Sequence, residues 1–229
     1  MTSTNGPYAD TRDMYMAHTM FRREFSLMPG LVRDVAVGDA ERVQIVSDHI
    51  EFVETILHHH HDAEDKHLWP KLQAREPVSA AGIVRVMEEQ HAEIDRIGTE
   101  IADAMAAWRR NADADSRGTL ADALDRMNLL VVEHTALEEE RILPLVEKCV
   151  TAAEWDLMIR EGGEDTPPEI LPLILGMMMY EGDPELIKDI VSGLPPKQGP
   201  AIEDIASQAF ASHSKRIHGT STPPRSTGF

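Results

Sequence analysis

The chain has 229 residues, enough for one full domain with an appended segment. Its 40 acidic residues outnumber 22 lysines and arginines, so the net charge is −18 and no basic stripe can follow a phosphate backbone. We therefore expect no nucleic-acid partner. The single cysteine, Cys149, cannot close an intrachain disulfide, which fits a reducing compartment and excludes a site built from several thiolates.

Two features set the expected location of the protein. The first ten residues lack the basic and then apolar pattern of a signal peptide. The longest apolar run, residues 170–180, contains Pro172 and Gly176 and is too short to cross about 30 Å of hydrocarbon. We expect a cytoplasmic protein without a membrane span.

Helical periodicity dominates the first 150 residues, where apolar residues recur at intervals of three and four and never alternate as in a strand. Caps and breakers divide this part into four expected helices, over residues 11–37, 39–76, 79–111 and 115–151. Short loops make consecutive long helices antiparallel. The predicted fold is all-α, an up-down-up-down four-helix bundle.

The remaining residues predict a smaller helical extension. Thr151 and Glu154 have the spacing of a capping box, and a last helix is expected from Pro200 to about His218. The tail from Gly219 is rich in Ser, Thr and Pro and is expected to be disordered. The expected units are therefore the bundle (1–150), the extension (151–218) and the tail (219–229).

A doubled histidine and glutamate pattern is the most informative feature of the chain. In each half an isolated histidine lies on an apolar helical face, and the half also contains a His-x-x-x-Glu pair. The second pair follows the first by 74 residues, and the second isolated histidine follows the first by 73. The residues are His18, His60, Glu64, His91, His134 and Glu138.

The apolar residues around these positions repeat in the same register. Before His60 the inward positions are Val46, Ile50, Val53 and Leu57, and 74 residues later they are Leu120, Leu124, Met127 and Val131. Both series keep the spacing of one helix face. The bundle is thus expected to be a helical hairpin used twice, with the polar residues on its inner faces.

The repeated residues predict a metal site. A histidine and a glutamate at i and i+4 lie on one helix face and can reach one ion. Four imidazoles and two carboxylates exceed the needs of one tetrahedral zinc, and nitrogen and oxygen ligands without thiolate suit iron or manganese. Burying two carboxylates without a cation would cost several kcal/mol. Two ions that share Glu64 and Glu138 are the simplest arrangement.

Other residues near the pattern have weaker expected roles. Within the run His58–His61 only His60 is expected to face inward, and His58, His59 and His61 are expected to be solvated. Candidates for contacting the ligands or moving protons are His67, Tyr15 and Glu54. The prolines after the two pairs, Pro70 and Pro144, are expected to kink or end their helices.

A ferritin-like carboxylate site is the main structural alternative. It uses Glu-x-x-His on two helices and a lone glutamate on the other two. The chain contains such spacings at Glu64 to His67 and at Glu88 to His91, but these lie on adjacent helices and Glu88 is off the inward face. The first helix also offers no lone inward glutamate, so this alternative is disfavoured.

The sequence around the pairs resembles the hemerythrin-like HHE cation-binding family over residues 10–150. The matching segments are HHDAED at 60–65 with LWP at 68–70, and HTALEE at 134–139 with ILP at 142–144. The segments GDPEL at 182–186 and RIHG at 216–219 are similar to the C-terminal extension of longer actinobacterial members.

This resemblance implies a four-helix bundle with two iron ions, bridged by carboxylates and an oxo or hydroxo group, that bind dioxygen or related small ligands. The implied ligands are the six repeated residues. Oxygen-carrying members place a further histidine four residues after the third-helix one, where this chain has Asp95. They also use an aspartate five residues after the fourth-helix histidine, where this chain has Glu139. Asp95 is therefore a possible extra ligand.

Two functions remain open from the sequence. With one imidazole fewer, the site is expected to favour a catalase- or peroxidase-like reaction with peroxide, dioxygen or nitric oxide over reversible storage. The alternative is a non-catalytic module that binds, stores or senses oxygen or nitric oxide. A purely structural bundle is the third and weakest interpretation, and no protein partner is indicated.

Overall fold

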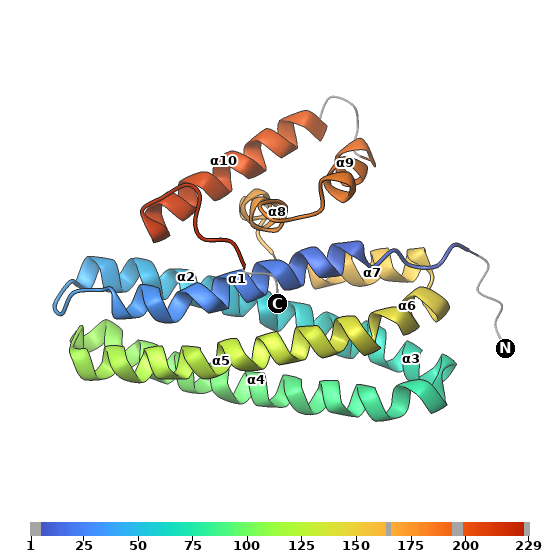
Figure 1. Cartoon of the computed structure of the whole chain (residues 1–229), viewed down its shortest axis with the longest axis horizontal. Coiled ribbons are helices and arrows are strands. Elements are labelled where there is room, and N and C mark those ends of the chain that lie inside the picture. The colour runs from blue at the N-terminus through green and yellow to red at the C-terminus, as the bar shows by residue number, and fades with distance from the viewer. Residues whose placement is uncertain (1–5, 164–165, 194–198, 227–229) are drawn as a thin grey trace.

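Four long helices form an antiparallel bundle in the computed structural model, which describes residues 6–163, 166–193 and 199–226 (Figure 1). They are α1 (Arg12–Arg33), α2 (Ala40–Ala63), α4 (Pro77–Asn111) and α5 (Ala114–Arg141). No named strand occurs in the described residues, so the predicted all-α class is confirmed. Within those residues, no helix is both long and apolar enough to pass through a bilayer.

Turn and capping residues set the helix ends, and these ends differ from those that the apolar pattern predicts. The first helix ends at Arg33, four residues before the predicted end, because a turn precedes Gly38, whose φ of +84° suits glycine. The Asp39 side chain then accepts a hydrogen bond from the backbone N–H of Arg42 and starts α2.

The bundle interior has two apolar clusters, one toward each end. In the first half of the repeat the first cluster ends at Leu57 of α2 and the second begins at Leu68; in the second half the corresponding residues are Val131 of α5 and Ile142, just past the end of α5. The inward residues of the repeat are all buried: Val46, Ile50, Val53, Leu57, Leu120, Leu124, Met127 and Val131. Each such side chain stabilises the fold by roughly 1.5–3 kcal/mol. The gap between the clusters is the level of the repeated histidines and glutamates.

Both prolines that follow the pairs lie where a helix changes. In the first half α2 passes into a π-helical turn, η1 (Glu64–Leu68), and then α3 (Trp69–Arg75), with Pro70 in the first turn. In the second half α5 ends and α6 (Leu143–Cys149) begins with Pro144 in its first turn. The breaks are as predicted, but only the first half inserts a π turn. Such turns often occur at functional sites.

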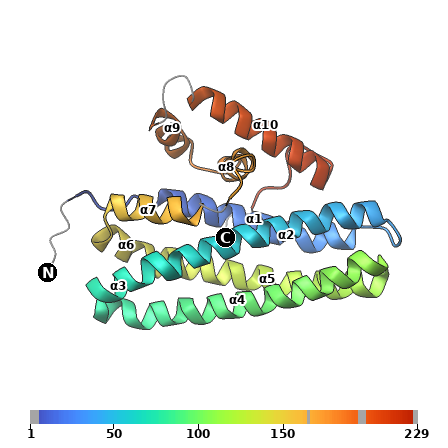
Figure 2. The same cartoon turned by 180° about the vertical axis from the view of Figure 1, so that it is seen from behind.

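The C-terminal helices lie on one side of the bundle. The predicted capping box of Thr151 and Glu154 starts α7 (Ala152–Gly162), which packs against α2. Three helices form a second layer over α1 and α2: α8 (Leu171–Met179), α9 (Pro184–Gly193) and α10 (Gly199–His218) (Figures 1 and 2).

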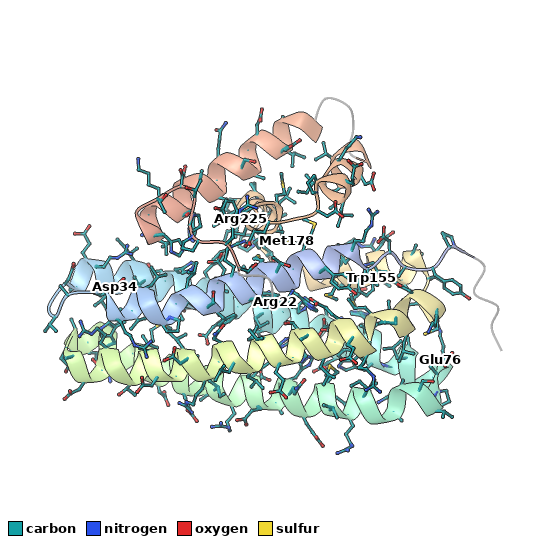
Figure 3. The ribbon with its side chains drawn as sticks, viewed as in Figure 1. Arg22, Asp34, Glu76, Trp155, Met178 and Arg225 are labelled. Atoms are coloured by element: carbon teal, nitrogen blue, oxygen red, sulfur yellow. The ribbon has the colours of Figure 1, made fainter. Side chains whose placement is uncertain are left out.

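Residues after α10 return toward the bundle. Figure 3 shows Met178 and Arg225 at the junction between the two layers. The Tyr180 hydroxyl donates to the carbonyl of Pro223 (2.8 Å), and the Arg225 guanidinium lies over the Tyr180 ring at 5.0 Å. The described part of the predicted disordered tail, residues 219–226, thus packs on α8.

Candidate metal centre

Seven ionisable side chains meet in one layer between the two apolar clusters. They come from all four long helices and from the first residue of η1: His18, His60, His61, Glu64, His91, His134 and Glu138. All are buried except His60, whose side chain is 15% exposed. The structure therefore brings together the six residues that the repeat singled out, and adds His61.

The seven residues form two groups that could each hold one metal ion. In each group the potential ligand atoms lie within 4.8 Å of one another. One group is His61, Glu64, His91 and His134, and the other is His18, His60, Glu64 and Glu138. Glu64 belongs to both groups, which is the position expected of a bridging carboxylate.

The carboxylate oxygens face histidines of different groups. Glu64 Oε1 lies 3.1 Å from His60 Nε2, and Glu64 Oε2 lies 3.4 Å from His91 Nε2. Glu138 Oε2 lies 3.3 Å from His18 Nε2 and 3.8 Å from His134 Nε2. Both glutamates therefore stand between the two groups, and each can bridge two ions.

The inward atoms of this layer have no hydrogen-bond partners. This holds for all four oxygens of Glu64 and Glu138, for Nε2 of His18, His60, His91 and His134, and for both ring nitrogens of His61. Each buried, unpaired polar group costs roughly 1–3 kcal/mol, and more when it is charged. Two cations would satisfy these atoms together, so the donor set fits a pair of metal ions.

The outward nitrogens of three histidines, in contrast, are held in place. Nδ1 of His18 lies 3.1 Å from Glu139 Oε1, and Nδ1 of His91 lies 2.8 Å from Asp65 Oδ1. Nδ1 of His134 lies 3.2 Å from the side-chain oxygen of Gln90. Partners of this kind fix the ring so that the other nitrogen points at the metal.

The acidic partners are themselves anchored. Arg22 donates to Glu139 (2.8 Å) and to the Thr135 hydroxyl (3.0 Å), and the indole N–H of Trp69 donates to Asp65 (2.6 Å). Asp65 and Glu139 directly follow the two inward glutamates and are 74 residues apart. The repeat thus contained the signal for these two positioning residues, although its helical periodicity did not single them out.

Burial and neighbouring charges set the proton occupancy of the layer. Burial raises the pKa of Glu64 to about 8. Burial alone would lower the pKa of His18, but the carboxylates of Glu138 and Glu139 raise it to about 9. The pKa of His91 also rises to about 9 because Asp65 and Glu64 outweigh its burial. Metal ions would displace these protons, so binding is coupled to proton release.

The expectation that His61 is solvated is wrong. Its side chain is 3% exposed and stacks on His91, with ring centroids 4.0 Å apart and an interplanar angle of 14°. His60 and His61 follow Leu57 by three and four residues, and both spacings return to the same helix face. The layer therefore has five imidazoles.

Asp95 lies outside both groups. Its side chain is 59% exposed, and Oδ1 is 3.7 Å from Nδ1 of the equally exposed His58. His61 thus adds an imidazole to the layer, whereas Asp95 contributes to the bundle surface. The expected solvation of His58 is confirmed.

Of the three residues predicted to assist the ligands, two lie away from the inward atoms. Nε2 of His67 is 3.0 Å from Glu161 Oε2 on α7. Tyr15 is 42% exposed on α1. Within the part of the chain that the structure describes, neither side chain hydrogen-bonds or ion-pairs with the seven residues of the layer.

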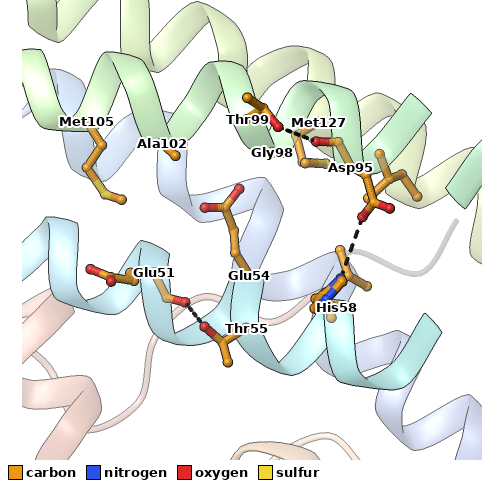
Figure 4. Close-up of a pocket in the computed structure, with 12 residues that line it drawn as sticks. Glu51, Glu54, Thr55, His58, Asp95, Gly98, Thr99, Ala102, Met105 and Met127 are labelled. Atoms are coloured by element: carbon orange, nitrogen blue, oxygen red, sulfur yellow. Dashed lines mark hydrogen bonds and ion pairs between the residues drawn. The ribbon is translucent and has the colours of Figure 1, made fainter. Parts of the chain in front are cut away.

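Glu54 instead points into a cavity of about 440 Å³ between α2 and α4 (Figure 4). Its Oε1 has no hydrogen-bond partner. Burial and the nearby charge of Glu51 raise its pKa to about 8, so it holds a proton at neutral pH. The cavity wall includes Leu57 and Ile94, which lie one helical turn from His61 and His91. The cavity therefore reaches the level next to the histidine layer.

Comparison with known families matches residues 10–146 to the hemerythrin HHE cation binding domain. Domains of this family bind metal cations, typically iron. No curated protein and no solved structure gives a significant match. The matched segment contains all seven residues of the layer and ends within α6.

Proposed function

Because the chain belongs to the hemerythrin HHE cation-binding family, we propose that the histidine layer holds two iron ions. The observation that carries this proposal is the set of unpaired buried atoms, in which four carboxylate oxygens face the ring nitrogens of five histidines. The proposed cofactor is a pair of iron ions joined by Glu64, Glu138 and an oxo or hydroxo bridge.

The two groups suggest different roles for the two ions. His61, His91 and His134 offer three imidazoles on one side, whereas His18 and His60 offer two on the other. Both groups have four donor residues, but the side with two imidazoles relies on the two glutamates, which are shared with the other ion, and so has more room for an external ligand. When bound there, iron supplies redox chemistry and an open position for a small ligand such as peroxide, dioxygen or nitric oxide.

We propose that the site reacts with peroxide, and that Glu54 handles protons for this reaction. Glu54 holds a proton in the cavity at neutral pH. It lies seven residues before His61 on α2, about 10 Å along the helix axis. A proton would therefore pass between Glu54 and the site through water in the cavity, not by direct contact.

Reversible binding of oxygen or nitric oxide is the second candidate function. The site lacks no imidazole relative to the oxygen carriers, because His61 supplies a fifth one from α2. The five imidazoles and two carboxylates of this layer equal in number the ligands of the oxygen-carrying members, which have one histidine more than the six repeated residues. Storage or sensing thus has specific support.

Tag-free, iron-loaded protein separates the two functions. Peroxide disproportionation predicts rapid oxygen release on addition of hydrogen peroxide. Glu54→Gln should slow it about tenfold or more with unchanged iron content, because proton transfer by a positioned group contributes a large factor. Asp103→Asn, an exposed carboxylate of α4 that does not line the cavity, is the control. A stable, reversible adduct with dioxygen and no turnover would instead establish the second function.

A further inference from the structure

A third cluster of histidine and glutamate lies where the C-terminal layer meets the bundle. It consists of Glu24 on α1, His49 on α2 and His218 at the end of α10, and one potential ligand atom from each lies within 4.8 Å of the others. Glu24 is 1% exposed and His49 is 2% exposed. His49 precedes His60 by eleven residues, or about 16 Å along α2, so the two sites share no residue.

His49 is arranged in the same way as the histidines of the candidate metal centre. Its Nδ1 is held by His213 Nε2 at 3.1 Å, with both residues on facing helices. Its Nε2 lies 3.3 Å from Glu24 Oε2 but has no hydrogen-bond partner. His18, His91 and His134 show the same anchored outward nitrogen and unpaired inward one.

The charges around the cluster leave room for a cation. Arg23 is fully buried between two carboxylates, 2.7 Å from Glu24 Oε1 and 3.0 Å from Glu181 Oε2. Arg23 thus occupies one oxygen of Glu24 and leaves Oε2 facing His49. A cation bound there would satisfy both this oxygen and the unpartnered Nε2 of His49.

The histidine of α10 is fixed in position beside Glu24 and His49. Arg42 of α2 donates to the backbone carbonyls of Arg216 and Ile217, which fixes the end of α10. The His218 ring is 6.1 Å from that of His49, centroid to centroid.

We propose that Glu24, His49 and His218 form a separate site for one divalent transition-metal ion that fastens α10 to the bundle. Two imidazole nitrogens, one carboxylate oxygen and one open position are a donor set that zinc uses in proteins. The bound ion would join residues from α1, α2 and α10. Occupancy would therefore control how firmly the C-terminal layer is held.

Zinc retention by tag-free full-length protein tests this site. After iron loading, the protein is dialysed against Zn²⁺ and then against metal-free buffer, and zinc and iron are counted by mass spectrometry. Wild type should retain one more zinc per chain than His218→Ala and His49→Ala. His58→Ala, an exposed histidine outside all three clusters, should match wild type. The difference of one zinc does not depend on what the larger centre binds.

A second measurement guards against variants that misfold. His218→Gln keeps the size and hydrogen-bonding capacity of the side chain but should lose the zinc while retaining helical circular dichroism and the iron spectrum. Zinc should raise the melting temperature of wild type and leave that of His218→Gln unchanged. Equal zinc in wild type and in folded His218→Gln would overturn the proposal, and would leave the direct contact of His49 with Glu24 as the reason for the cluster.

Discussion

Asp65 and Glu139 show how single residues make the two halves of the centre equivalent. Each follows an inward glutamate, and each holds the Nδ1 of an isolated histidine from another helix. Asp65 holds His91 and Glu139 holds His18, so the repeat in sequence becomes an approximate two-fold relation in the site. The outward partners are therefore as much a part of the repeat as the inward donors.

Asp65→Asn should weaken iron binding by about 10- to 100-fold, because an outer partner fixes ring orientation and raises ligand basicity. The amide can still accept a hydrogen bond from His91 but carries no charge. Competition with a chelator of known affinity measures the effect. Asp62→Asn, an exposed carboxylate at the end of α2, should not change the affinity. An unchanged affinity in Asp65→Asn would contradict the assigned role.

His61→Ala tests the fifth imidazole. Removing the ring opens a cavity between His91 and His134 and takes one donor from the group of three. We expect the variant to hold less than two iron ions per chain and to have an altered visible spectrum. His59→Ala, its neighbour outside both groups, should retain the wild-type spectrum. If His61→Ala kept iron content and spectrum, His61 would be a packed residue and no ligand.

Glu54 should make stability depend on pH. Its pKa is about 8 in the folded protein and near 4.5 in the unfolded chain, so the folded state holds the proton more tightly. Its contribution is fully present below pH 4.5 and is lost as the pH rises toward 8. Glu54→Gln should remove this loss of stability. A pKa shift is worth at most ~1.4 kcal/mol per pKa unit, and solvent in the cavity reduces that value, so we expect a difference on the order of 2 kcal/mol at pH 8.

Urea unfolding of wild type and Glu54→Gln at pH 5 and pH 8 measures this difference. Subtracting the two proteins removes the common pH dependence of the metal centre. Asp103→Asn should show the wild-type slope, since Asp103 is exposed and does not line the cavity. Parallel stability curves for wild type and Glu54→Gln would show that the carboxyl is ionised in the folded protein.

The existence and order of the long helices could be predicted from the sequence, but the irregular turns within them could not. The three-four spacing of apolar residues is strong in α1, α2, α4 and α5, so their existence and order follow from sequence. The π turn of η1 depends on where the backbone of Glu64 accepts its hydrogen bond, here from the N–H of Trp69, and no residue type encodes that choice. The same limit applies to His61, because three-four spacing admits two neighbouring histidines on one face.

Gly176 marks the closest approach of two elements in the C-terminal layer. A methyl group there would overlap the carbonyl oxygen of Ala206 on α10 and lie 2.9 Å from the Phe210 Cβ. Gly176→Ala should therefore force α8 and α10 apart and cost about 1–3 kcal/mol. Thermal unfolding and limited proteolysis of the C-terminal layer measure the loss.

Gly82→Ala in α4 is the matched control for Gly176→Ala. Its new methyl group meets no atom within 4 Å, and alanine is favoured over glycine inside a helix by roughly 0.5–1 kcal/mol. It should be neutral or stabilising. A Gly176→Ala variant as stable as Gly82→Ala would show that the two helices are not tightly packed in solution.

In the molecule as a whole, a layer of polar side chains divides the apolar core of the four-helix bundle in two. Apolar clusters lie above and below it, and its inward atoms are unpaired without a cation. The position of this layer was predictable, because polar residues replace apolar ones at the same register in each half. The docking of the C-terminal layer was not, since Arg23, Glu24 and His49 carry no spacing that points to partners more than 150 residues away.

We propose that Glu64 and Glu138 bridge two iron ions held by five histidines. Iron counting on tag-free protein from iron-replete cells, in wild type and in Glu64→Gln, tests it most directly. We predict two iron ions per chain in wild type with the visible absorption of a bridged ferric pair, and loss of that absorption with at most one iron in Glu64→Gln. Wild-type protein without stoichiometric iron, or Glu64→Gln that still holds two, would contradict the claim.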